Sequence, residues 1–279
     1  MSLAYLNGDF KALEECQVSV LDRGFIFGDA VYELIPVYNN KPFQLARHLK
    51  RLARSLNEIA IQTPHDDQQW QGIIQSLIDH YEQEQCSIYI QITRGVAARD
   101  HAYPKSVAPT VFVMVNPWPT ASDTYLTQGL SAVTREDIRW DRCDIKVTSL
   151  LANVMMKQQA VNQQAHETLL VRDGVVLEGS SSNVFVVQAG QVFTAEKNHL
   201  ILPGITRDVV IDLLQQCSIR LIERAVSIED LKCADEIWIT SSTKECLPIT
   251  LLNGQAVGDA RPGKYWRQVY DAFQTMKSL

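Results

Sequence analysis

The sequence predicts an α+β protein with two domains. Candidate strands and helices mix along the chain without the regular strand–helix alternation of a doubly wound parallel sheet. The length of 279 residues allows one large or two medium hydrophobic cores. The apolar share of 46% and the charged share of 21% are those of an ordinary globular protein.

The first half of the chain contains two predicted helices and two predicted strands. Apolar residues within 45–61 recur mostly at helical spacing, and a second helix is expected at 67–84. Apolar and β-branched residues at 87–93 and 109–115 indicate two strands, which we expect to be neighbours in one sheet.

A domain boundary is predicted near the middle of the chain, where residues 116–123 hold two prolines and several turn formers. We predict a smaller N-terminal domain at 1–118, a linker at 119–123 and a larger C-terminal domain at 124–279. In the larger domain, strands are expected at 130–134, 169–171, 184–187, 191–194 and 236–240, and helices at 148–164, from a start within 202–208, and at the C-terminus through Trp266, Val269 and Phe273.

Composition indicates the class of partner. The net charge of -6 works against general nucleic-acid binding, and no apolar stretch has the length of a signal sequence or a membrane span. Six cysteines lie scattered without C-x-x-C spacing, which argues against a zinc site or a disulfide framework. We therefore expect a cytoplasmic protein with reduced thiols, no metal and a small-molecule partner.

Two residues, Lys146 and Glu178, suggest a pyridoxal phosphate site. A lysine amine can hold the cofactor's aldehyde as a Schiff base, and a carboxylate can keep its pyridine nitrogen protonated. Lys146 is expected at the end of an extended segment just before a helix, and Glu178 at the end of a short strand after the turn at 173–174. The alternative for each residue, taken alone, is a solvated surface position.

Phosphate binding is suggested at two further places. The segment Leu202-Pro203-Gly204-Ile205-Thr206 joins a glycine turn to a helix start, which leaves the amides of Ile205 and Thr206 available to an anion. Ser242 supplies a hydroxyl at the end of a predicted strand, and Arg51 supplies a fixed charge from the inner side of its helix. The alternatives are an ordinary capped helix and a structural salt bridge of Arg51.

A carboxylate site is suggested after the strand that ends at Thr93. Arg99 and His101 lie in one short loop, where a guanidinium could bind a carboxylate with two hydrogen bonds. Tyr32, in the segment that begins Asp22-Arg23-Gly24, could add a phenol. The alternatives are an ion-paired surface loop and a tyrosine used in packing.

Together these segments resemble the family of D-amino-acid transaminases, branched-chain aminotransferases and aminodeoxychorismate lyases. The resemblance rests on several motifs in the family's order: D-R-G-x-x-F-G-D-x-x-Y-E at 22–33, H-x-x-R-L at 48–52, Lys146, E-G-S-S-S-N at 178–183 and L-P-G-I-T-R at 202–207. Within the family, the loop carrying Arg99 and His101 and the segments at 136–140 and 142–146 are most similar to D-amino-acid transaminases.

The resemblance implies a two-domain fold of type IV, with pyridoxal 5'-phosphate in the interdomain cleft of a homodimer. Lys146 would carry the cofactor and move the proton, and Glu178 would pair with the pyridine nitrogen. Arg51, Ile205, Thr206 and Ser242 would hold the phosphate, and Tyr32, Arg99 and His101 would bind the substrate carboxylate. Two departures are Asp100, where a small neutral residue is expected, and Ser242, where threonine is common.

The implied reaction moves the amino group of a D-amino acid, such as D-alanine, to a 2-oxo acid, such as 2-oxoglutarate. An aminodeoxychorismate lyase and a branched-chain L-aminotransferase remain the alternatives within the family, and the Arg99–His101 loop argues against both. A protein that binds pyridoxal phosphate without turnover is an alternative from another class.

Overall fold

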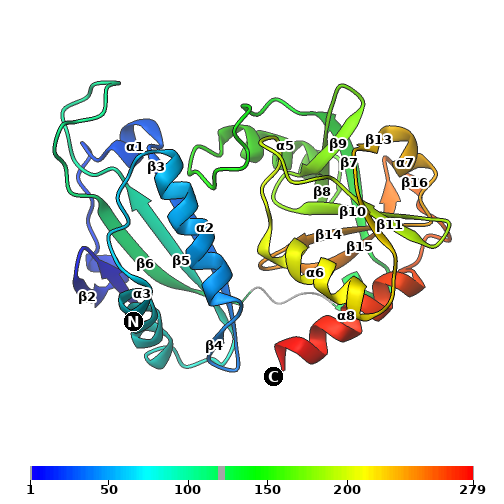
Figure 1. Cartoon of the computed structure of the whole chain (residues 1–279), viewed down its shortest axis with the longest axis horizontal. Coiled ribbons are helices and arrows are strands. Elements are labelled where there is room, and N and C mark those ends of the chain that lie inside the picture. The colour runs from blue at the N-terminus through cyan, green and yellow to red at the C-terminus, as the bar shows by residue number, and fades with distance from the viewer. Residues whose placement is uncertain (1, 119–122, 279) are drawn as a thin grey trace. The chain divides into compact units, whose positions relative to one another are not determined.

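The computed structural model describes residues 2–118 and 123–278, and most of the predicted linker lies outside these ranges. The chain forms two compact units (Figure 1). The first unit comprises Met1–Pro119 and Ile145–Leu150, and the second comprises Thr120–Asp144 and Leu151–Leu279. Both contain a sheet and helices, which confirms the predicted α+β class.

The first unit is built on a six-stranded antiparallel sheet with the order β2-β1-β6-β5-β3-β4. Its strands are β1 (Leu3–Leu6), β2 (Asp9–Ala12), β3 (Ala30–Tyr38), β4 (Lys41–Pro42), β5 (Cys86–Thr93) and β6 (Thr110–Pro117). The predicted pair at 87–93 and 109–115 is confirmed as the neighbours β5 and β6. The hairpin of β1 and β2 is an element that the sequence analysis did not predict.

Helices α2 (Leu45–Glu58) and α3 (Asp67–Asp79) share one hydrophobic core with this sheet. Leu49, Leu52 and Leu56 of α2 are buried because their spacing puts them on one face of the helix. Helix α3 begins at a capping box of Asp66 and Gln69 and ends at Asp79, five residues before the predicted end. The unit also holds a 3-10 turn, η1 (Leu13–Glu15), and the short helix α1 (Arg23–Phe27).

The segment Ile145–Leu150 returns to the first unit after the chain has entered the second. Val147 forms a β-bridge with Val31, and the amide of Tyr32 donates to the carbonyl of Lys146 at 2.9 Å. Ile145 and Val147 are buried in the core of the first unit. Lys146 is therefore fixed to β3, whereas the predicted boundaries assigned it to the larger domain.

The second unit contains a ten-stranded mixed sheet with the order β12-β11-β10-β14-β15-β7-β8-β9-β13, and β16 pairs with β15. Its strands are β7 (Leu130–Glu136), β8 (Glu167–Arg172), β9 (Val175–Gly179), β10 (Asn183–Gln188), β11 (Gln191–Thr194), β12 (Leu221–Glu223), β13 (Val226–Ser227), β14 (Glu236–Ser241), β15 (Glu245–Leu252) and β16 (Gln255–Ala256). Strand β7 runs parallel to both β15 and β8. The five predicted strands correspond to β7, β8, β10, β11 and β14, whereas β15 was not predicted.

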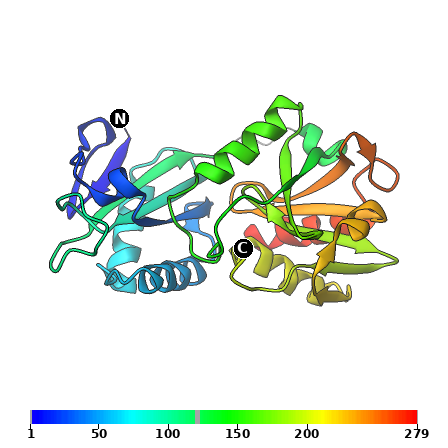
Figure 2. The same ribbon diagram turned by 90° about the horizontal axis from the view of Figure 1, so that it is seen from above.

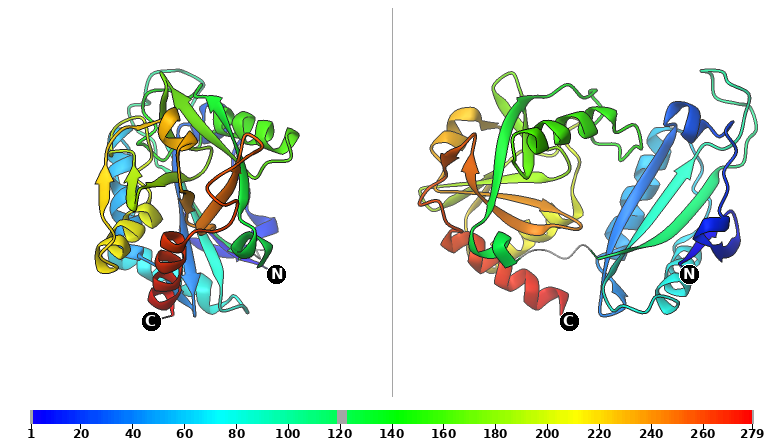
Figure 3. Two further views of the ribbon diagram at one scale, coloured as in Figure 1. Left: turned by 90° about the vertical axis from the view of Figure 1, so that its right-hand side faces the viewer. Right: turned by 180° about the vertical axis from the view of Figure 1, so that it is seen from behind.

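Within the described residues of this unit, five helices accompany the sheet, and Figures 2 and 3 show them from other sides. They are α4 (Asp123–Thr127), α5 (Leu151–Asn162), α6 (Ile205–Gln216), α7 (Ile228–Lys232) and α8 (Lys264–Lys277). Helices α6 and α8 pack on each other and on β14 and β15. Helix α8 confirms the predicted C-terminal helix, and its Trp266, Val269 and Phe273 are buried. Over the described residues, none of the helices combines the length and apolar character needed to cross a bilayer.

Candidate active site

Lys146 and Tyr32 lie together in the first unit. The Lys146 ammonium lies 4.1 Å from the centroid of the Tyr32 ring, and that ring lies 5.7 Å from the ring of Tyr89. Besides the Tyr32 amide bound to its carbonyl, Lys146 has its own amide bound to the Ser55 hydroxyl at 3.4 Å. The backbone at Lys146 is thus held by β3 and α2, while its side chain lies over an aromatic face.

Arg51 takes part in a buried ion pair. Its Nε and Nη2 donate to the two carboxylate oxygens of Glu33 at 2.7 and 2.8 Å, and His48 Nδ1 lies 2.8 Å from Glu33 Oε2. Burial opposes ionisation of Glu33, but the Arg51 guanidinium prevails and holds the pKa of this carboxyl well below its usual range. Arg51 therefore forms the structural salt bridge considered as an alternative, and its role in phosphate binding stays a prediction.

Glu178 lies at the end of β9 in the second unit, after the predicted turn at Asp173 and Gly174. The residue is 4% exposed, and its carboxylate accepts hydrogen bonds on both oxygens. Arg139 Nη1 donates a short hydrogen bond to Oε1, and Asn183 Nδ2 and the Leu202 amide donate to Oε2 at 3.1 and 3.0 Å. Three different segments thus fix the orientation of one acid.

The surroundings of Glu178 also set its acidity. Burial raises the pKa of Glu178 to about 7, although the Arg139 guanidinium and the Leu202 amide act in the opposite direction. The carboxyl therefore changes charge near neutral pH. One more donor directed at it, such as a protonated ring nitrogen, would favour the charged form.

A second buried acid, Glu167, supports the turn that follows Glu178. Its carboxylate accepts from the hydroxyls of Ser180 and Ser182 and, at 2.7 Å, from the ammonium of Lys244. Lys244 follows Ser242 in the turn between β14 and β15. The turn carrying Ser180 and Ser182 and the turn carrying Ser242 and Lys244 are thereby joined through one carboxylate.

The start of α6 presents amides to its surroundings, as predicted. Its N-cap is Gly204, which offers no side chain to the first turn. Ile205 and Thr206 are buried and lie in the first turn of α6, where backbone amides have no partner within the helix. In the same unit, the buried hydroxyl of Thr240 has no partner within the described part of the chain. Buried donors without partners are uncommon and suit a polar ligand.

Arg99 and His101 lie around the ring of Phe27 in the first unit, with the Arg99 guanidinium 5.3 Å and the His101 ring 5.5 Å from its centroid. Within the described residues, neither forms a hydrogen bond, ion pair or ring contact with Tyr32. Asp100 is exposed and makes no ion pair with Arg99 over the same residues; its carboxylate accepts from the Ala102 amide at 3.3 Å. The Asp100 side chain is therefore in solvent.

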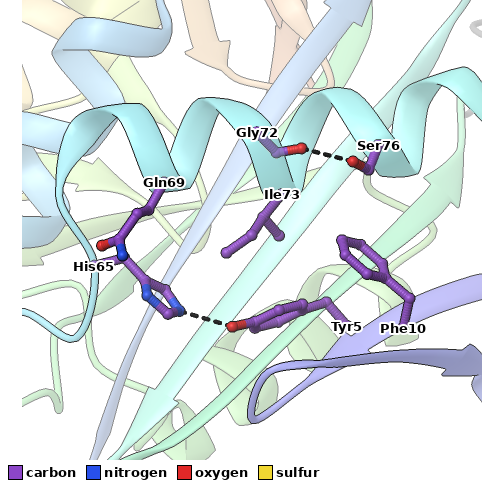
Figure 4. A pocket seen from close by; sticks show the side chains of 7 residues that line it. All are labelled: Tyr5, Phe10, His65, Gln69, Gly72, Ile73 and Ser76. Carbon is purple, nitrogen blue, oxygen red and sulfur yellow. Dashed lines mark hydrogen bonds between the residues drawn. The ribbon is translucent and has the colours of Figure 1, made fainter.

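A shallow pocket lies elsewhere in the first unit, between β1, β2 and α3 (Figure 4). Tyr5, Phe10, His65 and Ile73 line it, and the Tyr5 hydroxyl lies 2.9 Å from His65 Nε2. None of the predicted site residues contributes to this pocket. No cluster of His, Cys, Asp and Glu side chains suited to a metal ion occurs within the described ranges.

Comparison with known proteins identifies the family. The family described as amino-transferase class IV matches residues 30–252. This chain belongs to the class IV aminotransferases. The match includes Lys146, Glu178 and the start of α6, and it confirms the predicted family and an aminotransferase activity.

Two relatives of this class IV aminotransferase are D-alanine aminotransferases. The protein from Bacillus licheniformis is 40% identical over 96% of this chain and 94% of its own length. The protein from Staphylococcus aureus (strain COL) is 38% identical over 98% of this chain and 97% of its own length.

Solved structures confirm the fold. The branched-chain amino acid aminotransferase of Escherichia coli matches with a TM-score of 0.92 and 24% identity, over 98% of this chain and 94% of that one. A fold IV transaminase from Curtobacterium pusillum matches with a TM-score of 0.86 and 24% identity, over the whole of both chains. The predicted type IV fold is therefore confirmed.

The side chains and helix start described above have the chemistry that pyridoxal phosphate requires. The second unit offers the buried carboxylate of Glu178, the buried start of α6 and the buried Thr240 hydroxyl, which has no partner within the described residues. The first unit offers Lys146. Arg139 and Asn183 both bind Glu178, and neither role was predicted, although both residues lie in motifs that carried the resemblance. The role of Glu167 was not predicted either.

Proposed function

We propose that this class IV aminotransferase transfers the amino group of a D-amino acid, such as D-alanine, to a 2-oxo acid, such as 2-oxoglutarate. The observation that carries the proposal is the 40% identity to a D-alanine aminotransferase over almost the whole of both chains. The branched-chain aminotransferase of Escherichia coli is only 24% identical to this chain, so that likeness supports the shared fold and not a shared substrate. The Arg99–His101 loop also favours a D-amino-acid transaminase over an aminodeoxychorismate lyase.

Pyridoxal 5'-phosphate, when bound, supplies an aldehyde that condenses with amines and a ring that takes up electrons. Lys146 would hold this group through its Nζ and would take the proton from the substrate's α-carbon. Glu178 would pair with the ring nitrogen and favour its protonated form. Arg139 and Asn183 fix the direction of that carboxylate.

The phosphate is held by the amides of Ile205 and Thr206 at the start of α6, by the Ser242 hydroxyl and by the charge of Arg51. The free amides and the buried environment of the helix start support this assignment. Tyr32, Arg99 and His101 bind the substrate carboxylate. Arginine suits that task because its planar group offers two parallel donors.

The enzyme acts as a cytoplasmic homodimer on small amino and 2-oxo acids, without nucleic-acid or membrane partners. An exposed apolar patch on the first unit supports self-association: Val20, Leu21, Phe25 and Val96 are 70%, 49%, 76% and 48% exposed. The Ala97 amide binds the Leu21 carbonyl at 3.4 Å, so the two parts of the patch adjoin. Exposed apolar patches commonly mark protein interfaces. Sedimentation of the purified protein at the mass of one chain would contradict the dimer.

The proposed activity is tested by assaying the purified protein with D-alanine and 2-oxoglutarate, beside L-leucine and aminodeoxychorismate. We expect pyruvate and glutamate from the first pair, at a rate well above that with L-leucine. A clear preference for L-leucine or aminodeoxychorismate would replace the proposal by the corresponding alternative.

A further inference from the structure

We propose that Arg23 and Phe27 are positioning residues that fix Arg99 and His101 in the orientation needed to bind the substrate carboxylate. This inference rests on the proposed function, which assigns the carboxylate to Arg99 and His101. Arg23 and Phe27 belong to the D-R-G-x-x-F-G-D motif, for which the proposed mechanism otherwise gives no role.

The base of this arrangement is Asp29, a mostly buried carboxylate shared by two arginines. Arg23 Nε donates to Oδ2 at 2.8 Å, and Arg94 donates through Nε to Oδ2 at 2.7 Å and through Nη2 to Oδ1 at 3.0 Å. The side chains of Arg23 and Arg94 are 4% and 6% exposed. Such buried, charge-assisted hydrogen bonds hold planar guanidinium groups in defined directions.

Arg23 then binds the loop that carries the predicted carboxylate site. Its Nη1 donates to the Asp100 carbonyl at 2.5 Å and its Nη2 to the His101 carbonyl at 3.5 Å. The Arg23 amide also donates to the Gly95 carbonyl at 2.9 Å, at the start of the same loop. One buried side chain therefore fixes the backbone beside Arg99 and at His101.

Arg94 holds the far side of the loop. Its guanidinium carbon lies 3.6 Å from the centroid of the Tyr103 ring, close enough for a cation–π contact. The loop is thus attached to Asp29 by two routes, one through Arg23 and one through Arg94. An exposed loop held at several points loses less conformational entropy when a ligand binds.

Phe27 orients the two side chains themselves. Its ring centroid lies 4.8 Å from the guanidinium carbon of Arg23, 5.3 Å from that of Arg99 and 5.5 Å from the His101 ring. Aromatic faces attract cations such as the Arg99 guanidinium, and they also pack against other rings such as that of His101. The Phe27 ring therefore favours conformations in which Arg99 and His101 remain beside each other. Because both are exposed, nothing else among their described contacts restricts them in this way.

The test compares Phe27→Leu, Phe27→Tyr and Arg23→Gln with the parent enzyme. We expect Phe27→Leu to raise KM for D-alanine by about fivefold and Arg23→Gln by about tenfold or more, with kcat and the visible absorption of the bound cofactor little changed. Phe27→Tyr retains the aromatic face and should restore the parent KM. The rate with D-alaninol, which lacks the carboxylate, should not change in any variant.

Lys105→Gln is the matched control, because it removes a positive charge from an exposed position of the same loop. Its KM should equal that of the parent. If Arg23→Gln does not fold, the comparison of Phe27→Leu with Phe27→Tyr still tests the positioning role. An unchanged KM in Phe27→Leu, or equal losses with D-alanine and D-alaninol, overturns the positioning role.

Arg99→Ala separates this inference from the proposed function. If Arg99→Ala raises KM strongly whereas the Arg23 and Phe27 variants do not, the carboxylate assignment stands and the positioning role fails. If Arg99→Ala leaves KM unchanged, the carboxylate assignment fails and the positioning role fails with it.

Discussion

Lys146 and Tyr32 are joined twice, by a hydrogen bond from the Tyr32 amide to the Lys146 carbonyl and by the contact of the ammonium with the Tyr32 ring. The backbone contact places residues 146 and 32 side by side although they are 114 positions apart in the sequence. The ring contact restricts the side chain that is expected to carry the cofactor.

Lys146→Ala should abolish both the visible absorption of the purified protein and its transaminase activity, because no other amine would hold the cofactor in this position. The measurement is an absorption spectrum after exhaustive dialysis. Lys50→Ala, at an exposed position of α2, is the control and should keep the full spectrum. Persistent colour and activity in Lys146→Ala would assign the cofactor to another residue.

Glu178 predicts a pH dependence of cofactor binding. Its pKa of about 7 is higher than that of a glutamate in the unfolded chain, so folding favours the protonated acid. The stabilisation of the folded chain is complete below the unfolded pKa and is lost as the pH rises through about 7. Pairing with a protonated ring nitrogen favours the charged acid instead. The increase in Tm on adding pyridoxal phosphate should therefore be larger at pH 8 than at pH 6.

Glu178→Gln is the control for this pH dependence, since an amide does not titrate. The difference between the two pH values should become smaller in this variant. An identical pH dependence in both proteins would mean that another group controls it.

The extent to which sequence predicted this site depends on how local each feature is. The regular spacing of Leu49, Leu52 and Leu56 was enough to predict α2, and the Asp173-Gly174 turn was enough to place Glu178 at a strand end. Both signals lie within a few residues of the feature that they predict.

Long-range features were not predictable in this way. The segment around Lys146 leaves the second unit to bridge Val31, a pairing that no local pattern indicates. The bond between Arg139 and Glu178 spans 39 residues, and that between Lys244 and Glu167 spans 77. Strand β15 was also missed; its residues 245–249 pair with β14, and its other end pairs with β7 and β16. Such contacts depend on tertiary packing, which overrides local preference.

Glu167→Gln should lower the free energy of unfolding by about 3 kcal/mol or more, because it leaves the Lys244 ammonium without its buried counter-charge. Glu229→Gln is the matched control: it breaks a Glu–Lys pair whose side chains are 73% and 61% exposed, so it should cost less than about 1 kcal/mol. Denaturant unfolding of both variants provides the measurement. Equal small losses would show that the Glu167 pair does not hold the two turns together.

Gly204→Ala should weaken cofactor binding by about tenfold, because an added Cβ would lie 2.1 Å from the Asn183 side-chain oxygen and displace a donor to Glu178. Equilibrium titration with pyridoxal phosphate measures the effect. At Gly72, in α3, a Cβ would meet no atom within 4 Å, so Gly72→Ala should bind the cofactor normally and gain about 0.5–1 kcal/mol of stability. Unchanged affinity in Gly204→Ala would remove Asn183 from the account of the site.

The most direct test of the central claim is the stoichiometry of the reaction with D-alanine alone. A transaminase should release one pyruvate for each bound cofactor and then stop until a 2-oxo acid is added, because the amino group remains on the enzyme. L-alanine should release far less. Continuous release of pyruvate from D-alanine without a 2-oxo acid would contradict the assignment. Release of pyruvate from L-alanine but not from D-alanine would also contradict it.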